Sequence, residues 1–228
     1  MNYRNLKLLF CLVVSLSLLL FSCQTNDKEI IENDKLSYLE TIGKEHNELL
    51  IEFLENNKTN NFKNTKSLVR SFYEFSIKNN PELKDYEEFY NKQLEGFNVG
   101  LKTSEIYANF KVELNVLSNN KHISQYMRDN LLSIVKNPTL EHTYDVIHKM
   151  QRNPNLTIDE KNSLKAFVNV LEASKDLWQN SKFALTSKGL DPSEKAMIGD
   201  ALGGALWWWT GPAAALIAGG YSLALYNA

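Results

Sequence analysis

The chain has 228 residues, of which 25 are Lys or Arg and 27 are Asp or Glu, and its net charge is −2 with histidine neutral. A balance this close to neutral excludes a protein that finds nucleic acid by electrostatic attraction. Both cysteines, Cys11 and Cys23, lie near the amino terminus. The rest of the chain therefore has no disulfide scaffold, cysteine nucleophile or thiolate metal site.

The amino terminus has the pattern of a secretory signal. Arg4 and Lys7 precede an uncharged apolar run over residues 8–20. Such a run is short for a transmembrane helix, and its basic flank is typical of an export signal. Removal of this segment takes Arg4 and Lys7 with it, so the net charge of the mature protein falls from −2 to −4.

The apolar run ends in the letters LFSC at positions 20–23. This ending resembles the lipobox of bacterial lipoproteins, although Phe21 is bulkier than the residue usual in that family. The resemblance implies that a signal peptide, residues 1–22, is cleaved just before Cys23, which then carries diacylglycerol and a further acyl chain such as palmitate. By the same resemblance, Gln24 favours the outer membrane. An ordinary signal peptide cleaved elsewhere is the alternative.

The mature chain divides by composition into three parts. Residues 24–35 are polar and acidic, so we expect a lipidated tether over 23–33. A helical domain over 34–190 follows, in which Asn is abundant and Gly and Pro are sparse. The last part, 191–228, is predicted to be an apolar helical hairpin.

Apolar side chains recur at helical spacing through the predicted domain, and sustained alternation or Asn-Gly hairpin signals are missing from it. Thr157 and Glu160 form a capping-box pattern that opens the last of these helices. The sequence therefore predicts an all-α fold, an irregular bundle of about seven amphipathic helices with a C-terminal Gly/Ala/Trp-rich hairpin. The predicted helices cover 34–56, 66–79, 81–94, 104–117, 122–136, 139–152 and 157–185.

One polar cluster has spacing suited to chemistry. Glu141, Asp145 and His148 share a helix face at i, i+4 and i+7, and a hard or borderline metal could use such a set. His142 lies on another face, and a solvated helix surface is the competing interpretation. His46 stands among glutamates, and we expect it on a charged, exposed face. Because no nucleophile, phosphate or metalloprotease motif is present, we expect no enzyme and no cofactor apart from the covalent lipid.

The C-terminal segment carries no charged side chain after Asp200. Small residues recur four apart, as at Gly199 and Gly203, which is the pattern that lets helix backbones approach closely. The sequence Thr-Gly-Pro at 210–212 is predicted to break the segment into two helices. We expect hairpin packing or membrane contact at six positions in this segment: Gly199, Gly203, Trp207, Trp208, Trp209 and Gly219.

Three interpretations of this segment remain open. A helix that is apolar all round is expected to be buried, which makes the hairpin the hydrophobic centre of the bundle. The layout over 191–228 also resembles pore-forming colicin domains and the glycine-zipper helices of some bacteriocins, which implies a membrane-active hairpin. The third interpretation is a permanent transmembrane helix, because the tryptophans at 207–209 and Tyr226 are about 27 Å apart on a helix, close to the thickness of a bilayer core.

These observations predict a lipid-anchored, non-enzymatic protein of the bacterial cell envelope with a helical binding or interaction domain. The expected location is the outer membrane, on its periplasmic or surface face. The expected partners are the membrane, through the lipid on Cys23, and an envelope protein, with no nucleic acid. The alternative is a membrane-perturbing, colicin- or bacteriocin-like protein that acts through its C-terminal hairpin.

Overall fold

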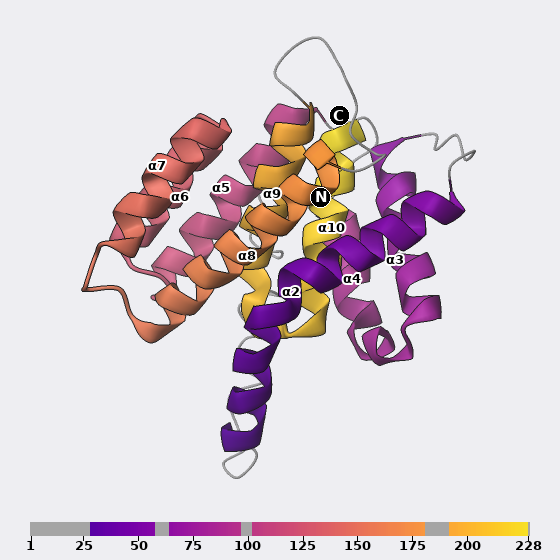
Figure 1. Ribbon diagram of the computed structural model, residues 1–228, viewed down its shortest axis with the longest axis horizontal. Helices are drawn as coiled ribbons and strands as arrows, with labels where there is room; N and C mark the ends of the chain where they lie inside the picture. The colour runs from indigo at the N-terminus through magenta and orange to yellow at the C-terminus, as the bar shows by residue number, and fades with distance from the viewer. Residues whose placement is uncertain (1–27, 58–63, 97–101, 181–191, 228) are drawn as a thin grey trace, which may run out of the picture. The chain divides into compact units, whose positions relative to one another are not determined.

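The computed structural model describes residues 28–57, 64–96, 102–180 and 192–227, and every regular element within these ranges is a helix (Figure 1). The prediction of an all-α fold is confirmed. In chain order the elements are α2 (Lys28–Asn56), α3 (Thr65–Asn79), η1 (Pro81–Tyr86), α4 (Glu87–Gly96), α5 (Thr103–Asn119), α6 (Gln125–Lys136), α7 (Leu140–Gln151), α8 (Ile158–Asn180), α9 (Pro192–Trp207), η2 (Trp208–Thr210) and α10 (Pro212–Asn227).

The chain forms two compact units, residues 1–36 and 37–228, and the second contains the bundle. Most predicted helix bounds agree with the structure to within a few residues. The segment predicted as one helix over 81–94 is divided into a 3-10 helix, η1, and the α-helix α4. Helix α2 begins at Lys28, inside the segment predicted as a tether. The predicted lipidation site, Cys23, lies outside the described residues.

Polar side chains begin several helices. The Ser67 backbone N–H of α3 donates to the Asn64 side chain, and the Met127 N–H of α6 donates to the Ser124 hydroxyl. The capping box predicted at the start of α8 is confirmed. The Glu160 N–H donates to Thr157 Oγ1 at 3.2 Å, and the Thr157 N–H donates to Glu160 Oε2 at 2.9 Å. These bonds satisfy backbone donors that a helix terminus leaves without partners.

The hairpin of α9 and α10 is the hydrophobic centre of the bundle. The two helices pack against each other, α9 lies on α8, and α10 lies on α3 (Figure 1). All residues over 196–207 and 213–225 are buried. This arrangement agrees with the first interpretation of the tail, because helices that are apolar all round need cover on every side. Within the described ranges, none of the helices has both the length and the apolar character needed to cross a membrane.

Small residues let these helices approach closely. A Cβ atom added to Gly203 would lie 2.9 Å from the Ala218 Cα of α10, and one added to Gly219 would lie 2.7 Å from the Phe72 ring of α3. At Gly199 it would overlap the end of the Leu225 side chain. All three predicted glycines therefore lie at contacts within the bundle.

The three consecutive tryptophans have different surroundings. Trp207 ends α9 and is buried, with its ring 5.7 Å from that of Trp209. Trp208 and Trp209 form η2 at the turn of the hairpin and are only partly buried. Gly211 follows with a φ of 63°, a left-handed conformation that favours glycine, and it turns the chain into α10.

Candidate functional site

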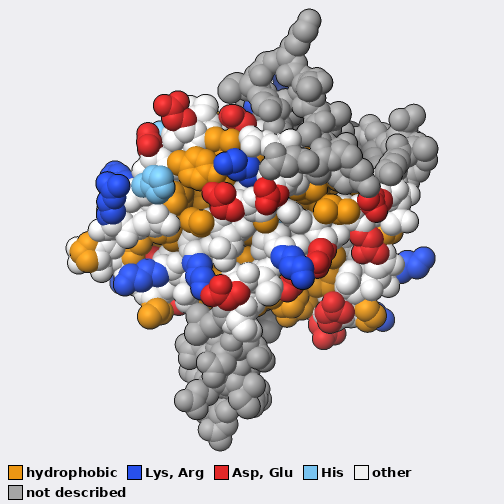
Figure 2. All heavy atoms as spheres, viewed as in Figure 1, with side chains coloured by type: hydrophobic (Ala, Val, Ile, Leu, Met, Phe, Trp, Pro, Cys, Tyr) orange, Lys and Arg blue, Asp and Glu red, His pale blue; other side chains and the backbone are white. Residues whose placement is uncertain are grey.

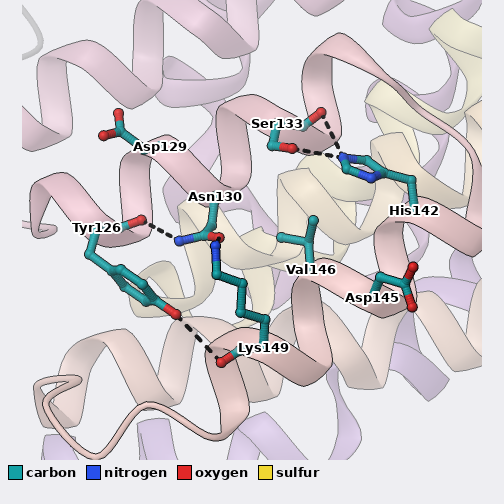
Figure 3. Close-up of a pocket in the computed structure, with 8 residues that line it drawn as sticks. All are labelled: Tyr126, Asp129, Asn130, Ser133, His142, Asp145, Val146 and Lys149. Atoms are coloured by element: carbon teal, nitrogen blue, oxygen red, sulfur yellow. Dashed lines mark hydrogen bonds between the residues drawn. The ribbon is translucent and has the colours of Figure 1, made fainter.

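A groove of about 480 Å³ lies between α6 and α7. Polar groups from both helices line it, together with the side chain of Val146 (Figure 3). Its lining residues are Tyr126, Asp129, Asn130 and Ser133 of α6 and His142, Asp145, Val146 and Lys149 of α7. We call these residues the α6–α7 groove.

Hydrogen bonds fix one end of the α6–α7 groove. Lys149 Nζ donates to Asn130 Oδ1 at 3.1 Å, while Asn130 Nδ2 donates to the Tyr126 carbonyl at 2.8 Å. The Tyr126 hydroxyl donates to the Lys149 carbonyl at 3.4 Å. Because the bonds made by Lys149 join one helix to the other, they hold the width of the groove at this end (Figure 3).

A serine and a histidine meet at the other end. Ser133 Oγ is 2.7 Å from His142 Nε2, which is the separation of a nucleophile and its general base. The Ser133 carbonyl lies 3.2 Å from the same nitrogen. A carbonyl only accepts, so it favours the tautomer with a proton on Nε2, and that nitrogen then cannot take the serine proton. The pair is therefore better suited to joining α6 to α7 than to catalysis.

The metal candidates predicted from sequence do not gather at one place. Only Asp145 lines the groove; Glu141 is exposed, and the ring of His148 lies 6.3 Å from that of Tyr144. In the part of the chain that the structure describes, no group of three or more His, Cys, Asp or Glu side chains could hold a metal ion. The histidine that lines the groove is His142, which the sequence places on a different helix face from the metal candidates.

The expectation that His46 is exposed is wrong. Its side chain is completely buried, and its Nε2 lies 3.2 Å from Oδ1 of Asp200, which is equally buried. Asp200 Oδ2 accepts a hydrogen bond from Ser174 at 2.7 Å and lies 3.4 Å from the indole nitrogen of Trp178. That indole also donates to Ser222 at 3.2 Å. This buried network connects α2, α8, α9 and α10.

A second, partly buried acid contacts the hairpin. The Tyr221 hydroxyl of α10 donates to Glu113 Oε1 of α5 at 2.8 Å, and Glu113 Oε2 is inaccessible to solvent. Burial raises the pKa of Glu113 to about 7, against the opposing effect of hydrogen bonds from Tyr221 and Trp207. Nothing in the local sequence distinguishes Glu113 from the surface glutamates.

Charges on one face of the molecule are mixed. On the face shown in Figure 2, acidic and basic side chains alternate around apolar ones and do not gather by sign. Such a face gives little long-range attraction to a polyanion.

Comparisons of the chain with protein-family models, with curated proteins and with solved structures find no match. The features of this chain that bear on its function are therefore the groove, the buried network and the hairpin.

Proposed function

We propose that this protein is a lipid-tethered, non-enzymatic component of the bacterial cell envelope, and that it binds a partner protein through the α6–α7 groove. The observation that carries the proposal is the groove itself, where hydrogen-bonding side chains of two helices surround an open volume of about 480 Å³. Hollows with a few convergent polar groups are the usual form of a binding site.

The charged groups of the groove indicate the chemistry of the partner. Lys149 is already bonded to Asn130, and Asp129 is paired with Arg128 at 2.7 Å. Asp145 is exposed on the groove wall, and Glu141 is exposed one turn earlier on α7. A partner segment that presents hydrogen-bond donors or a basic side chain would complement these two carboxylates.

The tether follows from the lipobox resemblance at Cys23. Several acyl chains, each contributing about 0.8 kcal/mol per buried CH₂ group, hold a protein stably on a bilayer. Gln24 supports the outer membrane as the location. Replacement of Cys23 by alanine should release the protein from the membrane fraction, which tests the tether separately from the groove.

Photo-crosslinking tests the groove in intact cells. A photoreactive residue in place of Asp145 should give an adduct of defined mass with an envelope protein. The matched control carries the same residue at Lys111 of α5, which is exposed and outside the groove. Equal adducts at both positions, or none at Asp145, would contradict binding at the groove.

A second function is favoured by one observation, which is that amphipathic helices surround an apolar hairpin rich in small residues. A protein of this construction could perturb a membrane by releasing α9 and α10. Against release, the buried network and the hydrogen bond from Ser163 Oγ to the Ala205 carbonyl, at 2.7 Å, join the hairpin to α2 and α8.

A reversible disulfide between α8 and α9 distinguishes the two functions. A Cβ atom added to Gly204 would lie 3.3 Å from Val170 Cβ, close to the separation of about 3.8 Å in disulfides. The double variant Gly204→Cys/Val170→Cys should therefore tie α9 to α8 when oxidised. Vesicle leakage that oxidation abolishes and reduction restores would establish the membrane-perturbing function. No leakage with the wild-type protein would support the packed centre.

A further inference from the structure

The turn of the hairpin reaches the surface. Trp208, Trp209 and Thr210 are partly exposed, as is Pro212, whereas residues 196–207 and 213–225 on either side are buried. Gly211 itself is buried, although a Cβ atom added to it would meet nothing within 4 Å. We call residues 208–212 the hairpin tip. The tip carries no charge and holds two indole rings.

The chain enters the bundle beside the hairpin tip. The second compact unit begins at Ser37, and the hydroxyl of the next residue, Tyr38, donates to the Pro212 carbonyl at 3.5 Å. Leu39 and Glu40 follow, and they contact Asn169 and Lys165 in the first half of α8. The start of the bundle and the hairpin tip therefore lie at the same end of this unit.

A further apolar side chain is placed at this end. The bond from Ser163 to Ala205 sets α8 against α9, and Gly204 lies against Val170. The two helices run in opposite directions, because Ser174, further along α8, contacts Asp200, which is earlier in α9. The first residue of α8, Ile158, is 75% exposed, and this register brings it to the level of the hairpin tip.

The length of chain before Tyr38 limits how far this end lies from Cys23. Ten residues of α2 precede Tyr38, and four residues join them to Cys23, so the connection reaches about 30 Å. A compact unit with the size of 37–228 is about 40 Å across. The point of entry therefore lies within about 30 Å of the anchor, which is less than the width of the unit.

We propose that the hairpin tip, with Ile158 at the same level of the bundle, contacts the interface of the membrane that holds the lipid. This proposal rests on the proposed lipid at Cys23. Tryptophan is the side chain best suited to such a place, because its ring is apolar and its N–H is polar. The tip thereby orients the bundle on the membrane.

Quenching by brominated lipid tests the contact. The mature, lipidated protein is reconstituted in phosphatidylcholine vesicles with bromine near the top of the acyl chains, and tryptophan emission is compared with that in unbrominated vesicles. The chain has four tryptophans, of which Trp178 and Trp207 are buried. The control variant Trp208→Phe/Trp209→Phe keeps only the two buried indoles.

The wild-type protein should lose a substantial fraction of its emission, up to about half, whereas the control variant should lose little. Equal quenching of the two proteins, or none in the wild type, would overturn contact at the tip. The mass of the purified protein reports acylation of Cys23 independently. A chain without lipid would overturn the tether and the tip contact together, whereas a lipidated chain with unquenched tryptophans would overturn the tip contact alone.

Discussion

His46 Nε2 lies 3.2 Å from Asp200 Oδ1, and both side chains are completely buried. The other ring nitrogen, Nδ1, lies 3.0 Å from the Asn47 side-chain oxygen. The orientation of that amide is fixed, because Asn47 Nδ2 donates to the Ala173 carbonyl at 2.7 Å. The imidazole therefore has an acceptor oxygen opposite each of its nitrogens, and the contact joins α2 to the central hairpin.

We expect His46→Ala and Asp200→Ala each to lower the free energy of unfolding by about 3–5 kcal/mol, because each leaves the other polar group buried without its partner. The double variant should lose less than the sum of the two. Urea unfolding at pH 7 measures all three. Glu48→Ala, on the exposed side of the same helix, is the control, with an expected change within about 0.5 kcal/mol. Additive losses would contradict a direct coupling of His46 and Asp200.

Glu113 should make the protein less stable as the pH rises. Its pKa is raised to about 7 in the folded state from a usual value of 4.5, so the folded protein holds a proton that the unfolded chain has released. The stabilising contribution is complete below pH 4.5 and is lost as the pH rises to about 7. The loss amounts to at most about 3 kcal/mol.

The groups that face Glu113 come from three helices: Tyr221 on α10, Trp207 on α9 and Tyr73 on α3. Glu113→Gln keeps an acceptor for Tyr221 and removes the titration. Urea unfolding at several pH values should show a flatter profile between pH 4.5 and 7 for this variant. Glu74→Gln, at an exposed position of α3, should leave the profile unchanged. An unchanged profile in Glu113→Gln would rule out this origin.

Glu160 should act in the opposite direction. Burial raises its pKa, but hydrogen bonds from Ser124 and Thr157 outweigh burial and lower it below 4.5. Its contribution is therefore present above pH 4.5 and is lost as the pH falls further. We expect Glu160→Gln to cost about 1–3 kcal/mol at pH 7 and less at pH 3. Thermal unfolding at the two pH values measures this, and a cost that is larger at pH 3 would contradict it.

The contacts of Glu160 show which interactions the local sequence predicts and which it does not. Thr157 and Glu160 are three residues apart, so their contact is visible in the sequence. The Ser124 N–H, which donates to Glu160 Oε1 at 2.7 Å, is 36 positions away and carries no signal there. Helix periodicity likewise predicts the fold class, but it does not predict which helices become neighbours.

The prediction for His46 is wrong because two signals in the sequence conflict. The adjacent glutamates indicate an exposed face, whereas the helical spacing of His46 indicates a buried one. It follows Leu39 and Ile42 at steps of three and four residues, and it precedes Leu50 by four. That spacing places it in the buried stripe of α2. The sequence holds this signal, whereas the partner, Asp200, lies 154 positions later and could not be identified without the packing of α9.

For the α6–α7 groove as well, the sequence contains the helical spacing but not the packing partner. His142, Asp145, Val146 and Lys149 follow one another at helical spacing and share a face of α7. The sequence favours the face with Glu141 and His148, because its residue types suit a metal. Only the position of α6 shows which face borders a groove.

Two glycines of α9 should respond differently to alanine. At Gly203 the added Cβ meets the backbone of Ala218, which cannot move without shifting α10, so we expect a loss of about 1–3 kcal/mol. At Gly199 it meets the end of the Leu225 side chain, which can change rotamer, and alanine gains about 1 kcal/mol in helix propensity. The midpoint of thermal unfolding should be lower for Gly203→Ala than for Gly199→Ala. The reverse order would contradict the contact of Gly203 with the backbone of Ala218.

The central place of the hairpin also determines when the protein can fold. Tyr38 meets Pro212 across 174 positions of sequence, and Phe72 of α3 packs against Gly219 of α10. Contacts this distant in sequence form late and slow the folding reaction. Helices α2 to α8 leave the ribosome before the hairpin that they cover. Until residues 192–227 have been made, these helices have no hydrophobic centre to pack against. Completion of this fold therefore has to wait until the hairpin has left the ribosome.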